Sequence, residues 1–325
     1  MGRIEAGTLS AQRLRDSAIV DGRKMIRIEP SILRGPCITT HAIPNSRDDA
    51  ASPASHAPRN RSAEKGAMSI DFSVLHREHH VKVEIKDGIA LVTLDRPERR
   101  NAVNAAMHHG LEIVFRELSY HPDVRVIVVT GAGEVFCAGG DMKDYADGPS
   151  APRDILRNRD LIWSMARCEA PLVSAVKGAA RGVGATIALM CDICYMADTA
   201  SIGDVHTQFG LPAGDGGQVI WPLLVGPNIA KEYLMRGIPI EAREAERIGL
   251  VNRVFGESEL IEQTMTCARE IAARPPDGVR WTKLAVNKMI LNQINLNLDF
   301  GLATEVLAAQ GARSLTELGR RSKTS

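Results

Sequence analysis

The feature that most constrains the fold is an alternation of strand-like and helix-like segments that begins at Val81. The stretch VKVEIKDGIALVTLDRP holds two strand-like runs joined at Asp87-Gly88, a dipeptide typical of type I′ hairpin turns. A helical pattern follows in AVNAAMHHGLEIVFREL, and VRVIVVTGAG then indicates a buried strand that ends in a glycine turn. The alternation continues with DILRNRDLIWSMARC as a helix, PLVSAVKGAA as a strand, ATIALMCD as a helix and ICYMADTASIG as a strand. This order predicts an α/β core.

Strand signals fade after about Gly226, and five later segments have helical spacing. We therefore expect a core over residues 68–255 and a helical C-terminal region over residues 256–325. Residues 1–67 mix arginine, serine, proline and aspartate without sustained apolar periodicity, which predicts a disordered extension. The acids in this segment argue against a transit peptide, and Met68 is an alternative start.

Composition excludes several classes of partner. The formal charge is +1, so we expect no nucleic-acid or membrane-surface partner. No window reaches the roughly 18 apolar residues of a membrane helix. The 6 cysteines are spread along the chain, and only Cys191 and Cys194 are close, without zinc-ligand spacing. A Cys-x-x-Cys redox motif is the alternative, but the pair ends an apolar helical run. We expect buried thiols, a cytoplasmic location and no metal.

Two glycine-rich stretches follow strands. RGVGATIALMCD and EVFCAGGDMKDY both place small residues where a helix is expected to begin, so a ligand can approach the backbone closely. The first amides of a helix have no partner inside it and bind polarised oxygens. Together the two stretches suggest an oxyanion hole made of two backbone N–H groups, although each alone is also explained by tight packing.

These stretches belong to a longer pattern. From about Val81 to Phe255 the chain resembles the crotonase (enoyl-CoA hydratase/isomerase) superfamily, in VTLDRPERRNAVN, VIVVTGAGEVFCAGGDMKD, PLVSAVKGAARGVGATIALMCDICYMADTASIG, GLPAGDGGQVIWPLLVGPNIAKEYLMRG and EAREAERIGLVNRVF. The resemblance implies a spiral of ββα units, a C-terminal trimerisation region, and a homotrimer or homohexamer. It also implies an acyl-CoA substrate whose thioester carbonyl accepts hydrogen bonds from the amides of Gly140 and Val183. Coenzyme A would enter only as part of the substrate, with its adenine near Arg100, Ala102 and Ala138.

The chain departs from the family where hydratases carry two catalytic glutamates. Those positions hold Thr186 and His206. Histidine can transfer protons, and Asp204 or Asp215 could orient it. Asp215 stands one residue beyond the position of the dehalogenase nucleophile, which is Gly214 here, and a turn-stabilising aspartate is its plainer interpretation. Other acids are weaker candidates: Glu134 and Glu244 as loop acids, Asp141 and Asp192 as structural residues.

The sequence therefore indicates an acyl-CoA enzyme, a lyase or isomerase of fatty acid metabolism, that stabilises a thioester enolate or oxyanion. One alternative is a thioesterase or a reverse-Claisen hydrolase that uses His206 with an aspartate. Others are a non-catalytic acyl-CoA-binding scaffold and a CoA-independent β-diketone hydrolase. No GxGxxG follows the first strand, so no redox cofactor is expected. The short C-terminal segment assigns no phosphate-binding lysine, and Lys283 and Lys288 are expected to be solvated.

Overall fold

The first two strands form the predicted hairpin. The computed structural model describes residues 71–141 and 151–321, and the chain enters through helix α1 (Phe72–His79). Strands β1 (Val81–Lys86) and β2 (Ile89–Leu94) pair antiparallel. Asp87 and Gly88 have φ angles of 52° and 80°, both in the left-handed region that a type I′ turn requires.

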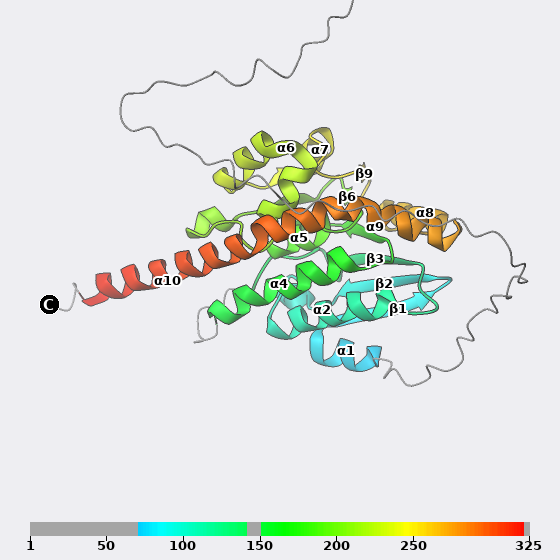
Figure 1. Ribbon diagram of the computed structural model, residues 1–325, viewed down its shortest axis with the longest axis horizontal. Helices are drawn as coiled ribbons and strands as arrows, with labels where there is room; N and C mark the ends of the chain where they lie inside the picture. The colour runs from blue at the N-terminus through cyan, green and yellow to red at the C-terminus, as the bar shows by residue number, and fades with distance from the viewer. Residues whose placement is uncertain (1–70, 142–150, 322–325) are drawn as a thin grey trace, which may run out of the picture. The chain divides into compact units, whose positions relative to one another are not determined.

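A six-stranded sheet in the order β1-β2-β3-β4-β6-β9 forms the centre of the fold (Figure 1). Every pairing after the hairpin is parallel. All positions of β3 are buried, which agrees with its continuous apolar sequence. The added strands are β3 (Val126–Gly131), β4 (Leu172–Val176), β6 (Ile193–Ala197) and β9 (Arg253–Phe255).

A second sheet, β5-β7-β8, corrects two predictions. The single strand expected over residues 171–180 is β4 followed by β5 (Ala179–Arg181), and that over residues 193–203 is β6 followed by β7 (Ser201–Gly203). The first break lies at Gly178, whose φ of 57° turns the chain out of the large sheet. Each break sends a strand into the second sheet before the next helix. These are the ββα units that the resemblance implied.

Helices pack against the sheets and against one another. Helix α2 (Ala105–Ser119) packs against α4 (Ala151–Arg167), and α4 packs against α10 (Asp299–Arg321), the orange-to-red helix of Figure 1. Helix α5 (Val183–Leu189) begins at Val183, as predicted, and α6 (Gly217–Arg236) is kinked at Gly226. The largest fully buried side chains are Trp221, Phe115 and Phe136.

The expectation that strands end near Gly226 is wrong. Strand β8 (Ile240–Glu241) joins the second sheet and β9 joins the first, with Tyr195 opposite Arg253. Two or three residues are too short to show a strand period, so periodicity could not find them. The other C-terminal elements are α7 (Ala242–Arg247), α8 (Leu260–Ala272), α9 (Pro276–Gln293) and the π-helical turn η5 (Ile294–Leu298).

The prediction that Lys283 is solvated is also wrong. Lys283 lies on α9 with only 5% of its side chain exposed, and its Nζ donates to Asp192 Oδ2 at 2.8 Å and to Ala170 O at 2.7 Å. Asp192 Oδ2 also accepts from the Leu172 backbone N–H at 2.7 Å. Asp192 is therefore structural, as expected, and it explains the burial of the lysine.

Two expectations fall outside the described residues. The disordered extension over residues 1–67 lies outside them, and so does the start of a helix after Asp141. In the part of the chain that is described, we find no helix both long and apolar enough to cross a bilayer.

Candidate active site

The candidate site is a cavity of about 540 Å³. Its walls come from the segment before residue 141, the start of α5, the turn η4 (His206–Phe209), the loop before α6, and helices α4 and α10. The residues that matter most in its lining are Gly140, Val183, His206, Asp215 and Glu305. Its size and mixed lining are those of a small-molecule site.

Gly140 and Val183, the two predicted amide donors, both line this cavity. A short bridge holds Gly140: the Val103 N–H donates to Gly139 O at 2.8 Å, and the Asp141 N–H donates to Val103 O at 2.9 Å. This pattern skips the Gly140 N–H. Among the turn and loop hydrogen bonds of the described residues, neither the Gly140 nor the Val183 N–H is a donor.

Buried polar side chains fix the loop that carries Gly140. Asn101, fully buried, donates through Nδ2 to Val135 O at 2.7 Å and to Ala132 O at 2.8 Å. Arg96 Nη1 donates to Asp141 Oδ2 at 2.7 Å. Asp141 therefore has the structural part that was expected of it.

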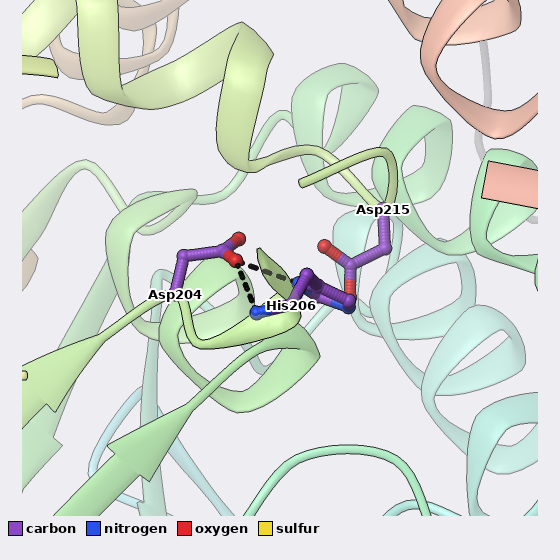
Figure 2. A group of neighbouring side chains, drawn as sticks. All are labelled: Asp204, His206 and Asp215. Atoms are coloured by element: carbon purple, nitrogen blue, oxygen red, sulfur yellow. Dashed lines mark hydrogen bonds and ion pairs between the residues drawn. The ribbon is translucent and has the colours of Figure 1, made fainter. Parts of the chain in front are cut away.

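His206 lies between two aspartates (Figure 2). Its Nδ1 is 2.6 Å from Asp204 Oδ1, and its Nε2 is 3.4 Å from Asp215 Oδ2. Asp204 follows β7 and Asp215 precedes α6, so the second sheet and α6 together place the three side chains. Gly182 permits this packing, since a Cβ there would lie 3.3 Å from His206 Cε1.

Glu305 is a fourth member that the sequence analysis missed. It lies on α10, is 4% exposed, and places Oε1 4.0 Å from His206 Nε2. We call Asp204, His206, Asp215 and Glu305 the His206 cluster. The only signal in the sequence is an acid among the apolar residues of LATEVLAAQG, and no local pattern brings it to a loop about 90 residues earlier.

Burial and neighbouring charges shift the pKa values of three members of the cluster. Burial alone lowers the pKa of His206, but the carboxylates of Asp215 and Asp204 outweigh it and raise the pKa to about 10. Burial raises the pKa of Asp215 to about 6, although His206 opposes the rise. Burial, then Asp215, raises the pKa of Glu305 to about 8. These shifts favour an imidazolium at His206 and a protonated carboxyl group at Glu305, with Asp215 the more acidic of the two carboxyl groups.

Thr186 contacts the His206 cluster from outside the cavity lining. It is fully buried and is absent from the described lining of the cavity, and its Oγ1 donates to Asp215 Oδ1 at 3.5 Å. Glu134 and Glu244, the two loop acids, are likewise absent from that lining. Glu244 instead lies in α7 and pairs with Arg247.

The predicted adenine-binding residues lie together beside the cavity. The Ala138 N–H donates to Arg100 O at 3.0 Å, and Ala138 lines the cavity. The Ala102 N–H donates to Arg99 O at 3.0 Å, and Ala102 O accepts from Arg96 Nη1. Arg100 is exposed, with a left-handed φ of 54°.

Two other kinds of chemistry, metal binding and thiol redox chemistry, have candidate residues in the described structure. One ligand atom each of Asp204, His206 and Asp215 lies within 4.8 Å of the others, a spacing that a cation could use. The contacts of His206 account for the same spacing, because both ring nitrogens face a carboxylate. Cys191 and Cys194 are buried free thiols whose pKa values burial raises, so they remain protonated at neutral pH.

Comparison with known proteins identifies relatives of the whole described core. Residues 84–307 match the sequence model described as enoyl-CoA hydratase/isomerase. YngF of Bacillus subtilis (strain 168) is 33% identical over 222 residues, which cover 67% of this chain and 83% of YngF. The 1,2-epoxyphenylacetyl-CoA isomerase of Escherichia coli (strain K12) is 30% identical over 234 residues, 70% of this chain and 89% of that protein. An enoyl-CoA hydratase/isomerase structure from Mycobacterium paratuberculosis matches with a TM-score of 0.68 and 34% identity, covering 71% and 94% of the two chains. The predicted crotonase fold is confirmed.

Proposed function

Because the chain belongs to the enoyl-CoA hydratase/isomerase family, we propose that it acts on an acyl-CoA thioester by removing and returning protons on the acyl chain. The observation that carries this proposal is a single cavity lined by Gly140, Val183 and three ionisable members of the His206 cluster. The cavity thus holds hydrogen-bond donors for an enolate oxygen beside groups that accept and donate protons.

The backbone would activate the substrate. The amides of Gly140 and Val183 donate hydrogen bonds to the thioester oxygen, and these bonds strengthen as negative charge develops there. A C2 proton then becomes easier to remove, because the enolate that remains is stabilised. Valine in place of the usual glycine at position 183 is compatible with this part, since only its N–H is used.

The side chains would move the proton. Asp215 is the base, because it lines the cavity as a carboxylate at neutral pH. The His206 imidazolium passes protons at Nε2, while Asp204 orients the ring through Nδ1. This division differs from the expectation that His206 itself is the base, because the two carboxylates keep it protonated. Moving a proton from C2 to another carbon shifts a double bond, so isomerisation is the first candidate reaction and hydration the second.

Hydrolysis is a second candidate function. The 2.6 Å contact between Asp204 and His206 is the carboxylate–imidazole pairing that prepares a histidine to activate water. A thioesterase or a reverse-Claisen hydrolase would use it. We rank it lower because an imidazolium has no lone pair with which to accept the proton of water. A scaffold ranks lower still, since burying four ionisable groups beside a cavity opposes stability unless they serve a reaction.

We extend the proposal to coenzyme A, assembly and location. Arg100, Ala102 and Ala138 would contact the adenine. A homotrimer or homohexamer would cover the large exposed apolar side chains of the C-terminal helices, which include Trp281, Val286, Met289, Leu296 and Phe300. Buried free thiols support a reducing, cytoplasmic location.

The test combines calorimetric binding of coenzyme A thioesters with mass spectrometry of enoyl-, β-keto- and saturated acyl-CoA after incubation. An unchanged mass with a shifted double bond supports isomerisation, and a gain of one water supports hydration. Release of coenzyme A or of a shortened acyl-CoA supports the hydrolytic candidate instead. Binding without product supports the scaffold, and neither binding nor product contradicts the acyl-CoA assignment.

A matched pair of variants tests the amide of Val183. Val183 is the first residue of α5, where proline fits the helix and removes only the N–H. We expect Val183→Pro to lower kcat on the accepted thioester by about 100-fold, the cost of one oxyanion donor, and Val183→Gly to change it by less than about threefold. Equal rates for the two variants would contradict this part of the proposal.

A further inference from the structure

Glu305 has the position of a reacting group. It comes from α10, far along the chain from the other cluster members, and its side chain reaches the lining of the cavity. Its Oε1 lies 4.0 Å from His206 Nε2, the ring atom that also faces Asp215. Both carboxyl groups therefore approach the same nitrogen from the cavity side, whereas Asp204 holds the opposite nitrogen.

The second oxygen of Glu305 is unpartnered. Among the described residues, Oε2 is buried and has no hydrogen-bond partner. A buried carboxyl oxygen without a partner is costly, so a purely structural glutamate would be expected to bond a backbone amide or a cation. Glu305 instead leaves Oε2 unpartnered beside Gly214, in a side chain that belongs to the lining of the cavity.

Close packing brings α10 to this point. A Cβ added at Gly214 would lie 2.7 Å from Glu305 Oε2 and would also overlap Gly301 O. A Cβ added at Gly301 would overlap Gln218 Nε2. Glycine at both positions therefore lets the helix approach the loop before α6. Gly214 is the position at which the sequence lacked an expected acid, and Glu305 supplies a carboxyl group to that place from another element.

The surroundings keep a proton on Glu305. The ionisable groups that face it are His206 on η4, Asp215 before α6, and Asp204 behind the ring. Helix α4, which packs against α10, adds the neutral side chains Ile155 and Asn158 to the cavity. Two carboxylates stand near one imidazolium, so a third negative charge would be unfavourable in this buried place. Glu305 is thus a buried acid beside an imidazolium that can return its proton.

We propose that Glu305, supplied from α10, is the second acid–base residue of the site. This inference rests on the proposed function. In an isomerisation, the C2–H bond breaks, its proton goes to Asp215, and its electron pair enters the enolate. Glu305 gives its proton to the carbon at the far end of the conjugated enolate, where a C–H bond forms. His206 then gives its Nε2 proton to the Glu305 carboxylate and takes the proton of Asp215, which restores the starting state.

The experiment measures two rates on full-length protein. Exchange of C2 protons for deuterium in D2O, on a saturated acyl-CoA, needs the enolate, Asp215 and exchange of the Asp215 proton with solvent through His206, but no proton from Glu305. Turnover of the accepted enoyl-CoA also needs the second proton transfer. We expect Glu305→Gln to keep exchange within about threefold of wild type and to lose at least about 100-fold in turnover, together with the alkaline fall of the pH–rate profile. The control Glu262→Gln, an exposed residue of α8, should change neither rate.

The outcomes separate the two proposals. Wild-type exchange no faster than the uncatalysed rate contradicts the proposed function and, with it, the assignment of Glu305. Wild-type exchange with full turnover by Glu305→Gln overturns only the assignment. Equal losses of exchange and turnover in this variant also overturn it, because they indicate a structural part. Glu305→Asp keeps a carboxyl group on a side chain that is shorter by one methylene, so it should show intermediate turnover and normal exchange.

Discussion

Two groups of charged side chains in this protein differ in how their charges are balanced and how their buried polar atoms are paired. The first is the pair of Lys283 and Asp192 beneath α9. Lys283 Nζ has two partners, and the single oxygen Asp192 Oδ2 accepts from both Lys283 and the Leu172 amide. The second is the His206 cluster, in which three carboxyl groups surround one imidazole. There, Asp204 Oδ2 and Glu305 Oε2 have no partner among the described residues.

The difference separates structure from chemistry. In the pair, one ammonium meets one carboxylate, and the contacts of both groups tie α9 to the chain around β4. A cluster with excess acid and unpartnered buried carboxyl oxygens opposes folding, but its members that line the cavity can exchange protons with a ligand. Burial of charge alone would not distinguish the two places. The balance of charge and the partners of the buried polar atoms do distinguish them.

The largest expected effect is catalytic and belongs to the cluster. Asp215→Asn keeps the shape of the side chain and removes the base, so we expect turnover of the accepted thioester to fall by about 1,000-fold. Steady-state kinetics measure the two rates, and circular dichroism checks that the variant is folded. A variant that retains a tenth of the wild-type rate would contradict the assignment of Asp215 as the base.

The next effect concerns stability and belongs to the pair. Asp192→Asn leaves the Lys283 ammonium buried without a counter-charge, although 24% of the Asp192 side chain is exposed and solvent softens the loss. We expect the free energy of unfolding to fall by about 2 kcal/mol, with kcat unchanged. Urea unfolding of wild type, Asp192→Asn and Asp215→Asn checks this. An Asp215→Asn protein that is less stable than Asp192→Asn would contradict the distinction.

A smaller effect is the pH dependence of stability. The pKa of Glu305 rises from 4.5 to about 8 on folding, so the folded protein holds this proton more tightly than the unfolded chain. That contribution is complete below pH 4.5 and is lost as the pH rises through 8. Glu305→Gln lacks it, so the Tm of this variant relative to wild type should increase between about pH 5 and 9. A constant difference across that range would show that Glu305 carries no shifted proton.

The smallest expected effect is that of a chelator. If the excess charge of the cluster is balanced by protons, dialysis against EDTA leaves turnover within about 20% of the untreated protein, as for any acid–base site without a metal. Loss of activity that zinc or magnesium restores would instead make Asp204, His206 and Asp215 ligands of a cation. Calorimetric titration with each ion gives an independent measure.

The sequence predicts the backbone part of the site better than the side-chain part. The hairpin at Asp87-Gly88 and the helix start at Val183 follow from local motifs, whereas Gly140 and His206 were assigned from the family resemblance. Backbone donors depend on turns, and turns are encoded by neighbouring residues. The breaks after β4 and β6 and the short strands β8 and β9 were missed, because their pairing is decided by distant partners.

Glu305 and Lys283 show the same limit for side chains. Each is a charged residue on a helix, where exposure is the ordinary expectation. Lys283 is buried because Asp192 stands opposite it, and Glu305 reaches the cavity because Gly214 and Gly301 let α10 approach. Neither fact is visible within one helix. Likewise, the sequence offered Asp204 or Asp215 as a partner of His206, and the structure shows that both carboxyl groups face its ring nitrogens at once.

The most direct test of the account is the exchange of C2 protons of a saturated acyl-CoA in D2O, followed by mass spectrometry. We predict that wild type incorporates deuterium far faster than the uncatalysed reaction and that Asp215→Asn does not exceed the uncatalysed rate. Incorporation by Asp215→Asn at the wild-type rate, or none by wild type, would contradict the claim that this cavity forms an enolate and moves its proton through the His206 cluster.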